Sequence, residues 1–70
     1  MDRESIAKLL TRRPFESFEL HLSSGEIIGI KHPENAFLTK GKILVVDPST
    51  DAVDIVSLLH VSSVRTLQNA

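Results

Sequence analysis

The segment FELHLSSGEIIGI, residues 18–30, contains two short apolar runs separated by a turn. From Phe18 onward every second residue of the first run is apolar, which is typical of a strand with one face in the core and one in water. Gly25 supplies the positive φ that a hairpin turn requires. The segment therefore predicts a β-hairpin with strands over about residues 17–23 and 26–32.

A short helix is predicted on the N-terminal side of this hairpin. Ile6, Leu9 and Leu10 follow the spacing of one helical face. Pro14 ends the helix, because the residue before a proline is pushed out of the helical region. The predicted helix covers about residues 3–12. A helix of this length is not stable alone, so we expect its apolar face to pack on the strands.

Three more strands are predicted on the C-terminal side, over about residues 42–47, 51–57 and 62–67. The first of them is apolar on both faces, which favours a central position in the sheet. The preceding TKGK segment reads either as a turn between two strands or as a bulge within one long strand.

Together these elements predict a single domain, residues 1–70, that is mainly β. It consists of an N-terminal α-helix followed by a five-stranded antiparallel small barrel, with the helix over one open end. The expected core residues are Ile6, Leu9, Leu10, Phe18, Leu20, Leu22, Ile28, Ile30, Phe37, Leu44, Val46, Val53, Ile55, Val61, Val64 and Leu67.

The order of helix, hairpin, bend and further strands resembles the small barrel of the Sm-like family, a layout that is also SH3-like. That family includes the spliceosomal Sm proteins and the bacterial RNA chaperone Hfq. The segment LHVSSV, residues 59–64, is similar to the Lys-His-Ala-Ile-Ser segment of Hfq, with His60 at the histidine and Leu59 in place of the lysine. The resemblance implies a ring in which His60 contacts RNA at a central pore.

A second resemblance rests on two shorter motifs. The chain looks like a group of short bacterial proteins that share a PFxxF segment, here residues 14–18, and an HPE segment, here residues 32–34. That group has no assigned function.

Five residues are candidate contacts for RNA or another ligand. His60 is one, Lys31, His32 and Asn35 would form a rim after the second predicted strand, and Arg12 belongs to a basic group on the helix. The competing interpretation is structural. In it, His60 turns the chain into its last strand, and the other four lie in a bend or on a solvated helix face.

The sequence predicts no enzyme, no cofactor and no metal site. Cysteine is absent, and the three histidines lack the short, fixed intervals of recognisable metal ligands. No nucleophile motif or Gly-rich phosphate loop occurs. The net charge of -1 gives no global attraction for nucleic acid or an anionic membrane.

These observations predict a cytoplasmic protein, because no apolar run is long enough to span a membrane and the first residues lack an apolar signal region. Small domains without disulfides or metals often rely on self-association, so a homo-oligomer is expected. The predicted function is a non-catalytic interaction or assembly module that acts through protein–protein contact or self-association, with an unidentified partner. The alternative is an Sm-like RNA-binding ring.

Overall fold

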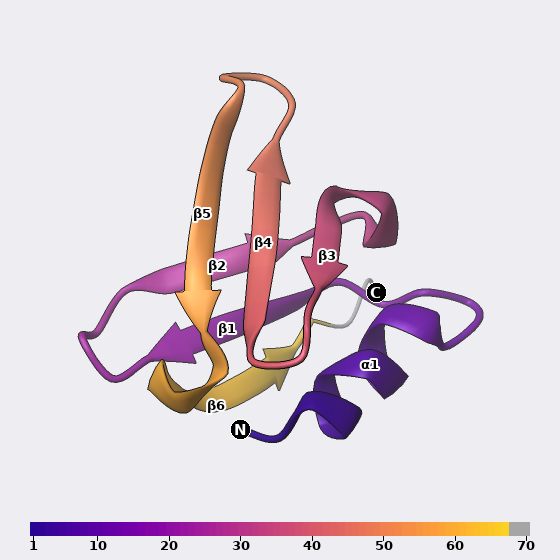
Figure 1. The fold of residues 1–70 in the computed structure, drawn as a ribbon. Helices are drawn as coiled ribbons and strands as arrows, with labels where there is room; N and C mark the ends of the chain where they lie inside the picture. The colour runs from indigo at the N-terminus through magenta and orange to yellow at the C-terminus, as the bar shows by residue number, and fades with distance from the viewer. Residues whose placement is uncertain (68–70) are drawn as a thin grey trace.

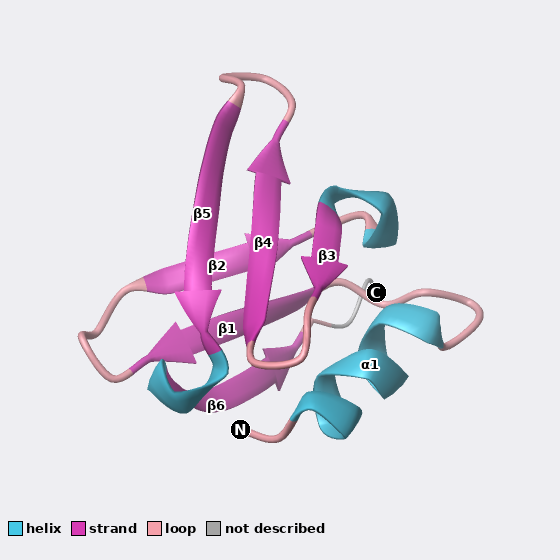
Figure 2. Ribbon diagram, viewed as in Figure 1, coloured by secondary structure: helices cyan, strands magenta, loops and turns pink. Residues whose placement is uncertain are grey.

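The computed structural model describes residues 1–67, and residues 68–70 of the predicted domain lie outside this range. The described residues form one α-helix, two 3-10 helices and six strands. Figures 1 and 2 show how these elements are arranged. The elements are α1 (Arg3–Thr11), β1 (Phe18–Leu22), β2 (Ile27–Ile30), the 3-10 helix η1 (Pro33–Asn35), β3 (Ala36–Leu38), β4 (Lys42–Asp47), β5 (Ala52–Ser57), the 3-10 helix η2 (Leu58–His60) and β6 (Val61–Thr66).

Helix α1 begins and ends with local hydrogen bonds. The Asp2 carboxylate accepts a hydrogen bond from the Ser5 N–H at 2.8 Å, which caps the first turn. At the other end the Arg12 N–H donates to the Lys8 carbonyl, and the backbone of Arg12 is already extended. Within residues 1–67, no helix is both long enough and apolar enough to cross a membrane.

The six strands form two three-stranded antiparallel sheets, with strand orders β2-β1-β6 and β3-β4-β5. The mainly β class with an N-terminal helix is therefore confirmed. In place of the predicted five-stranded barrel, the described residues form six strands in two sheets, with no closed barrel. The sixth strand is β3, whose three residues pair with β4. Two residues follow β2 before Pro33 begins η1, and this short helix separates β2 from β3.

A turn separates β3 from β4, which decides between the two interpretations of the TKGK segment. The Thr39 N–H donates to the Lys42 carbonyl at 2.8 Å, and the Lys42 N–H donates to the Thr39 hydroxyl at 3.0 Å. These bonds close a hairpin, so the two strands are distinct.

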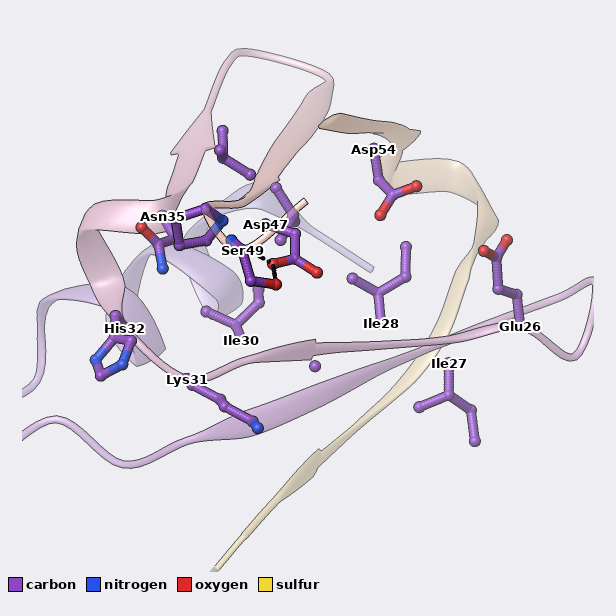
Figure 3. A pocket seen from close by; sticks show the side chains of 14 residues that line it. Glu26, Ile27, Ile28, Ile30, Lys31, His32, Asn35, Asp47, Ser49 and Asp54 are labelled. Carbon is purple, nitrogen blue, oxygen red and sulfur yellow. Dashed lines mark hydrogen bonds between the residues drawn. The ribbon is translucent and has the colours of Figure 1, made fainter. Parts of the chain in front are cut away.

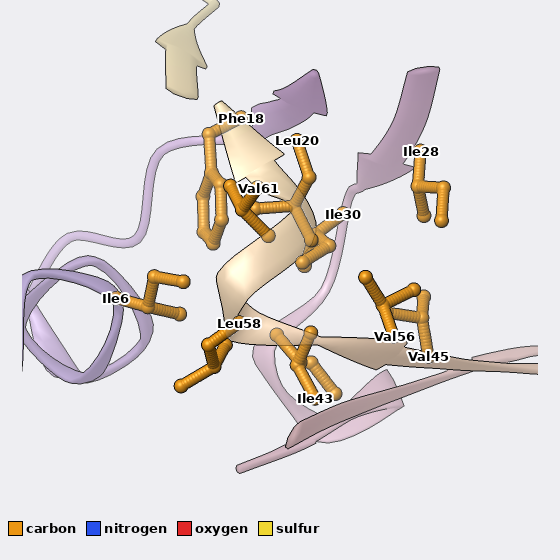
Figure 4. Close-up of a cluster of buried hydrophobic side chains, with 11 residues drawn as sticks. Ile6, Phe18, Leu20, Ile28, Ile30, Ile43, Val45, Val56, Leu58 and Val61 are labelled. Atoms are coloured by element: carbon orange, nitrogen blue, oxygen red, sulfur yellow. The ribbon is translucent and has the colours of Figure 1, made fainter. Parts of the chain in front are cut away.

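The core lies between the two sheets and α1, as Figure 4 shows. Ile6 reaches it from the helix, and Phe18 and Leu20 reach it from β1, and all three are fully buried. Among residues 1–67, the buried residues are Ile6, Phe18, Leu20, Ile28, Ile30, Ala36, Ile43, Val45, Val56, Leu58 and Val61.

The core prediction is wrong for the β3-β4-β5 sheet. In β4 the buried residues are Ile43 and Val45, whereas Leu44 and Val46 were expected. The same inversion exposes Phe37, Val53 and Ile55, three further residues expected in the core. A strand with apolar residues on both faces does not specify which face is buried, and a shift of one residue moves every side chain to the other side.

Candidate functional site

The largest group of exposed apolar side chains in the described residues lies on the outward side of the β3-β4-β5 sheet. We call this surface the outer face, and it consists of Phe37, Leu44, Val46, Val53 and Ile55. The exposed fractions are 56% for Phe37, 52% for Val53 and 64% for Ile55, and the other two are half-buried. Figure 1 shows this sheet in front of the β2-β1-β6 sheet, with its outward side toward the viewer.

Strand pairing places these side chains in two rows across the sheet. Leu44 lies opposite both Phe37 on β3 and Ile55 on β5, which makes one row. Val46 lies opposite Val53, which makes the second row two residues further along β4. Side chains two residues apart on a strand share a face, so the two rows are neighbours and form one continuous apolar surface.

Charged residues lie at the two ends of the outer face. Lys42 precedes the first row on the same side of β4, and the adjacent turn carries Lys40. Arg3 joins them, because its Nε donates a hydrogen bond to the Thr39 carbonyl at 3.1 Å. At the other end, beyond the valines, the β4–β5 turn carries Asp51.

The β5 strand is an edge of this sheet and is exposed over most of its length. Ala52, Val53, Asp54 and Ile55 are all exposed, and Val56 is the first buried residue of the strand. The β4–β5 hairpin therefore extends beyond the core, as Figure 1 shows.

Three of the five predicted contact residues meet at a second place, an open cleft of about 490 Å³ between the two sheets. Lys31, His32 and Asn35 lie along its rim, and Figure 3 shows Asp47 and Ser49 facing them across Ile30. His32 approaches Glu34 at 3.9 Å, and both side chains are largely exposed. The cleft is therefore a solvated rim over an apolar floor.

The Asp47 carboxylate in this cleft is held in its ionised form. The Ser49 hydroxyl donates to it at 2.6 Å and the Ser49 N–H at 3.0 Å, and these bonds lower the pKa of Asp47. A carboxyl group that acts as a general acid near neutral pH needs a raised pKa. The geometry gives Asp47 the role of a turn residue that fixes the start of the β4–β5 loop.

His60 does not line this cleft but an adjoining depression of about 480 Å³, which shares Glu26, Ile28 and Asp54 with it. The backbone carbonyl of His60 accepts a hydrogen bond from the Ser23 N–H at 2.8 Å, which ties η2 to the β1–β2 turn. Its neighbour Leu59 is 91% exposed.

Ser62, the first of the two serines that follow His60, has a structural role. The pairing of β1 with β6 shifts by one residue between His21 and Leu22, so that Ser62 is left over as a bulge. The Ser62 hydroxyl donates to the His21 carbonyl at 2.8 Å and satisfies an acceptor at this irregular point.

Arg12, the fifth predicted contact residue, lies at the end of α1. It forms an ion pair with Glu16 at 3.4 Å, and both side chains are substantially exposed. The five residues thus occupy two adjoining depressions and the end of α1, and the structure does not bring them together into one basic surface.

Sequence reasoning missed the outer face altogether, although one signal was present. Lys42 lies on the same face of β4 as Leu44 and Val46, and lysine is almost never fully buried. The position of Lys42 therefore favours an outward orientation for Leu44 and Val46. Comparison with known proteins adds no further assignment, because no protein family, curated protein or solved structure matches this chain.

Proposed function

We propose that this chain is a non-catalytic interaction module that binds protein through the outer face. The observation that supports the proposal is the continuous apolar surface over β3, β4 and β5. Apolar side chains scattered singly over a surface are common, whereas contiguous exposed apolar side chains with charged residues at their rim commonly mark interaction sites.

The energetic argument concerns the three most exposed members, Phe37, Val53 and Ile55. Complete burial of one such side chain contributes roughly 1.5–3 kcal/mol, and these residues are still about half in water. A protein that covers the outer face recovers part of that energy. The fold obtains nothing from their exposure, because the core is complete without them.

An Sm-like or SH3-like assignment and a cytoplasmic location remain parts of this proposal. The N-terminal helix and the short η2 link between two strands of different sheets support the Sm-like layout. In an Sm-like assembly, strands at sheet edges would join neighbouring copies, and the exposed β5 is a free edge of this kind.

The proposal is tested by site-specific photo-crosslinking in the cells from which the chain comes. A photo-reactive phenylalanine analogue replaces Ile55 in one variant of the full chain and Ile27 in another. Ile27 is the matched control, because it is an isoleucine of similar exposure (54%) on β2 of the other sheet.

We expect a discrete protein crosslink from position 55 and much less from position 27. The absence of a protein crosslink at position 55, or equal crosslinking at both positions, would overturn the proposal. A crosslink to RNA at either position would favour the RNA-binding ring in its place.

A further inference from the structure

We infer that the partner on the outer face is a second copy of this chain, packed face to face about a two-fold axis with the two β4 strands antiparallel. The inference rests on the proposed function and names the partner for the same surface. It comes from the order of side chains along the strands of the outer face. When a second copy runs in the opposite direction, each kind of side chain faces a kind that complements it.

The outward-facing side chains change in character along the strands. The first cross-strand pair is Lys42 with Ser57, and the next row holds the bulky side chains of Phe37, Leu44 and Ile55. The order from one end of the face to the other is therefore basic, large, small and acidic, because the two valines and then Asp51 follow.

Reversal of this order in a second copy matches each part with a suitable partner. With the axis between the two apolar rows, the row of Leu44 faces the valine row of the other copy, so that large side chains meet small ones. Alternation of large and small side chains allows facing layers to interdigitate. A two-fold axis repeats this contact between the large row and the small row, so both halves of the interface are filled.

The charged ends provide a second, independent match. Reversal brings Lys42 of each copy to the end where the other copy carries Asp51, at the rim of the interface. Two copies with parallel β4 strands would instead place Lys42 near its own equivalent, with Lys40 and Arg3 close by. Like charges in such positions disfavour that arrangement and specify the antiparallel one.

The size of the outer face sets the strength of the association. Strands about 4.8 Å apart and side chains about 6.6 Å apart along one face give the five side chains of the two apolar rows a footprint of roughly 160 Å². A standard stable interface needs about 800 Å² from each partner. The expected dimer is consequently weak and reversible.

Sedimentation equilibrium of the purified full chain tests the inference through charge reversal. We expect Lys42→Glu and Asp51→Lys each to weaken the dimer at least about tenfold at low ionic strength, because each change places like charges together at both ends. Lys8→Glu is the matched control, since this exposed lysine on α1 undergoes the same change of charge. It should leave the dissociation constant within about twofold.

A mixture of the two weakened variants is the decisive sample. Lys42→Glu in one copy faces Asp51→Lys in the other, so the mixture should associate more tightly than either variant alone. Because position 51 has a positive φ of 63°, Asp51→Asn serves as a second variant that removes the charge and tolerates this backbone. Circular dichroism verifies that every variant is folded.

Three results would overturn the inference. These are a monomer at 1 mM, an equal effect of Lys42→Glu and Lys8→Glu, and no recovery in the mixture. A monomer in solution together with a crosslink from position 55 to a different protein would reject the second copy and leave the proposed function standing. A monomer with no protein crosslink would reject both.

Discussion

Ile43 and Leu44 are adjacent in β4 and lie on opposite faces of its sheet. Ile43 is fully buried in the core, whereas Leu44 lies between Phe37 and Ile55 on the outer face. Two chemically similar neighbours thus have different roles, one in folding and one in the proposed association.

This relationship predicts unequal costs of truncation. Ile43→Ala should lower the free energy of unfolding by about 2–5 kcal/mol, because it leaves a cavity among buried side chains. Leu44→Ala should cost less, about 1 kcal/mol, since its side chain is only partly buried and lies outside the core. Urea denaturation followed by circular dichroism measures both values. Equal losses would show that Leu44 is part of the core after all.

The outer face predicts a variant that separates association from folding. Ile55→Lys should change the free energy of unfolding by no more than about 0.5 kcal/mol, because the side chain is mostly exposed. It should abolish the concentration-dependent association, since a charge would have to be buried in the interface. Ile27→Lys is the matched control and should associate as the unaltered chain does. If Ile27→Lys has the larger effect on sedimentation, the interface lies on the other sheet.

Asp51 predicts a backbone effect that is independent of its charge. Its φ of 63° lies in the left-handed region, which Asp, Asn and Gly tolerate and β-branched residues do not. Asp51→Val should therefore lower the free energy of unfolding by about 1–2 kcal/mol, and Asp51→Gly should remain within about 0.5 kcal/mol. Thermal unfolding of the two variants side by side provides the measurement, and similar midpoints would contradict the assigned turn geometry.

Two hydrogen-bonded carboxylates predict how stability depends on pH. The Ser5 side chain and N–H lower the pKa of Asp2, and the Ser49 hydroxyl and N–H lower the pKa of Asp47, both from a usual value of 3.8. A lowered pKa in the folded state gives stability that is present above 3.8 and is lost as the pH falls through the folded value. Below pH 4 the unfolding midpoint should therefore decline.

The double variant Asp2→Asn, Asp47→Asn isolates this contribution. Asparagine still offers an oxygen to each N–H but does not titrate in this range. We expect a shallower decline of the thermal midpoint between about pH 4 and pH 2 than in the unaltered chain. Parallel curves would show that other carboxyl groups cause the acid sensitivity.

Local patterns in the sequence predicted the local part of the fold. The helix follows from the spacing of Ile6, Leu9 and Leu10, and the first hairpin follows from alternation on both sides of Gly25. Each of these signals lies within a few residues, where helix caps, turn residues and periodicity act directly.

The arrangement of the strands could not be predicted in the same way. KILVVD is apolar at every interior position, so its sequence does not state which side is buried, and the Asp residues at 47 and 54 obscure the signal from Lys42. The short β3 strand also exists only through its pairing with β4. The candidate surface was missed for this reason, because its existence depends entirely on which side of β4 faces the core.

The order of strands also has a consequence for the folding pathway. The β3-β4-β5 sheet is built from one continuous stretch of chain, so its hairpins close short loops. The other sheet combines the local β1–β2 hairpin with β6, whose Thr66 lies opposite Phe18. Loop-closure entropy makes such distant pairings slow to form. We expect the sheet that carries the outer face to form early, and the pairing of β1 with β6 to complete the native state.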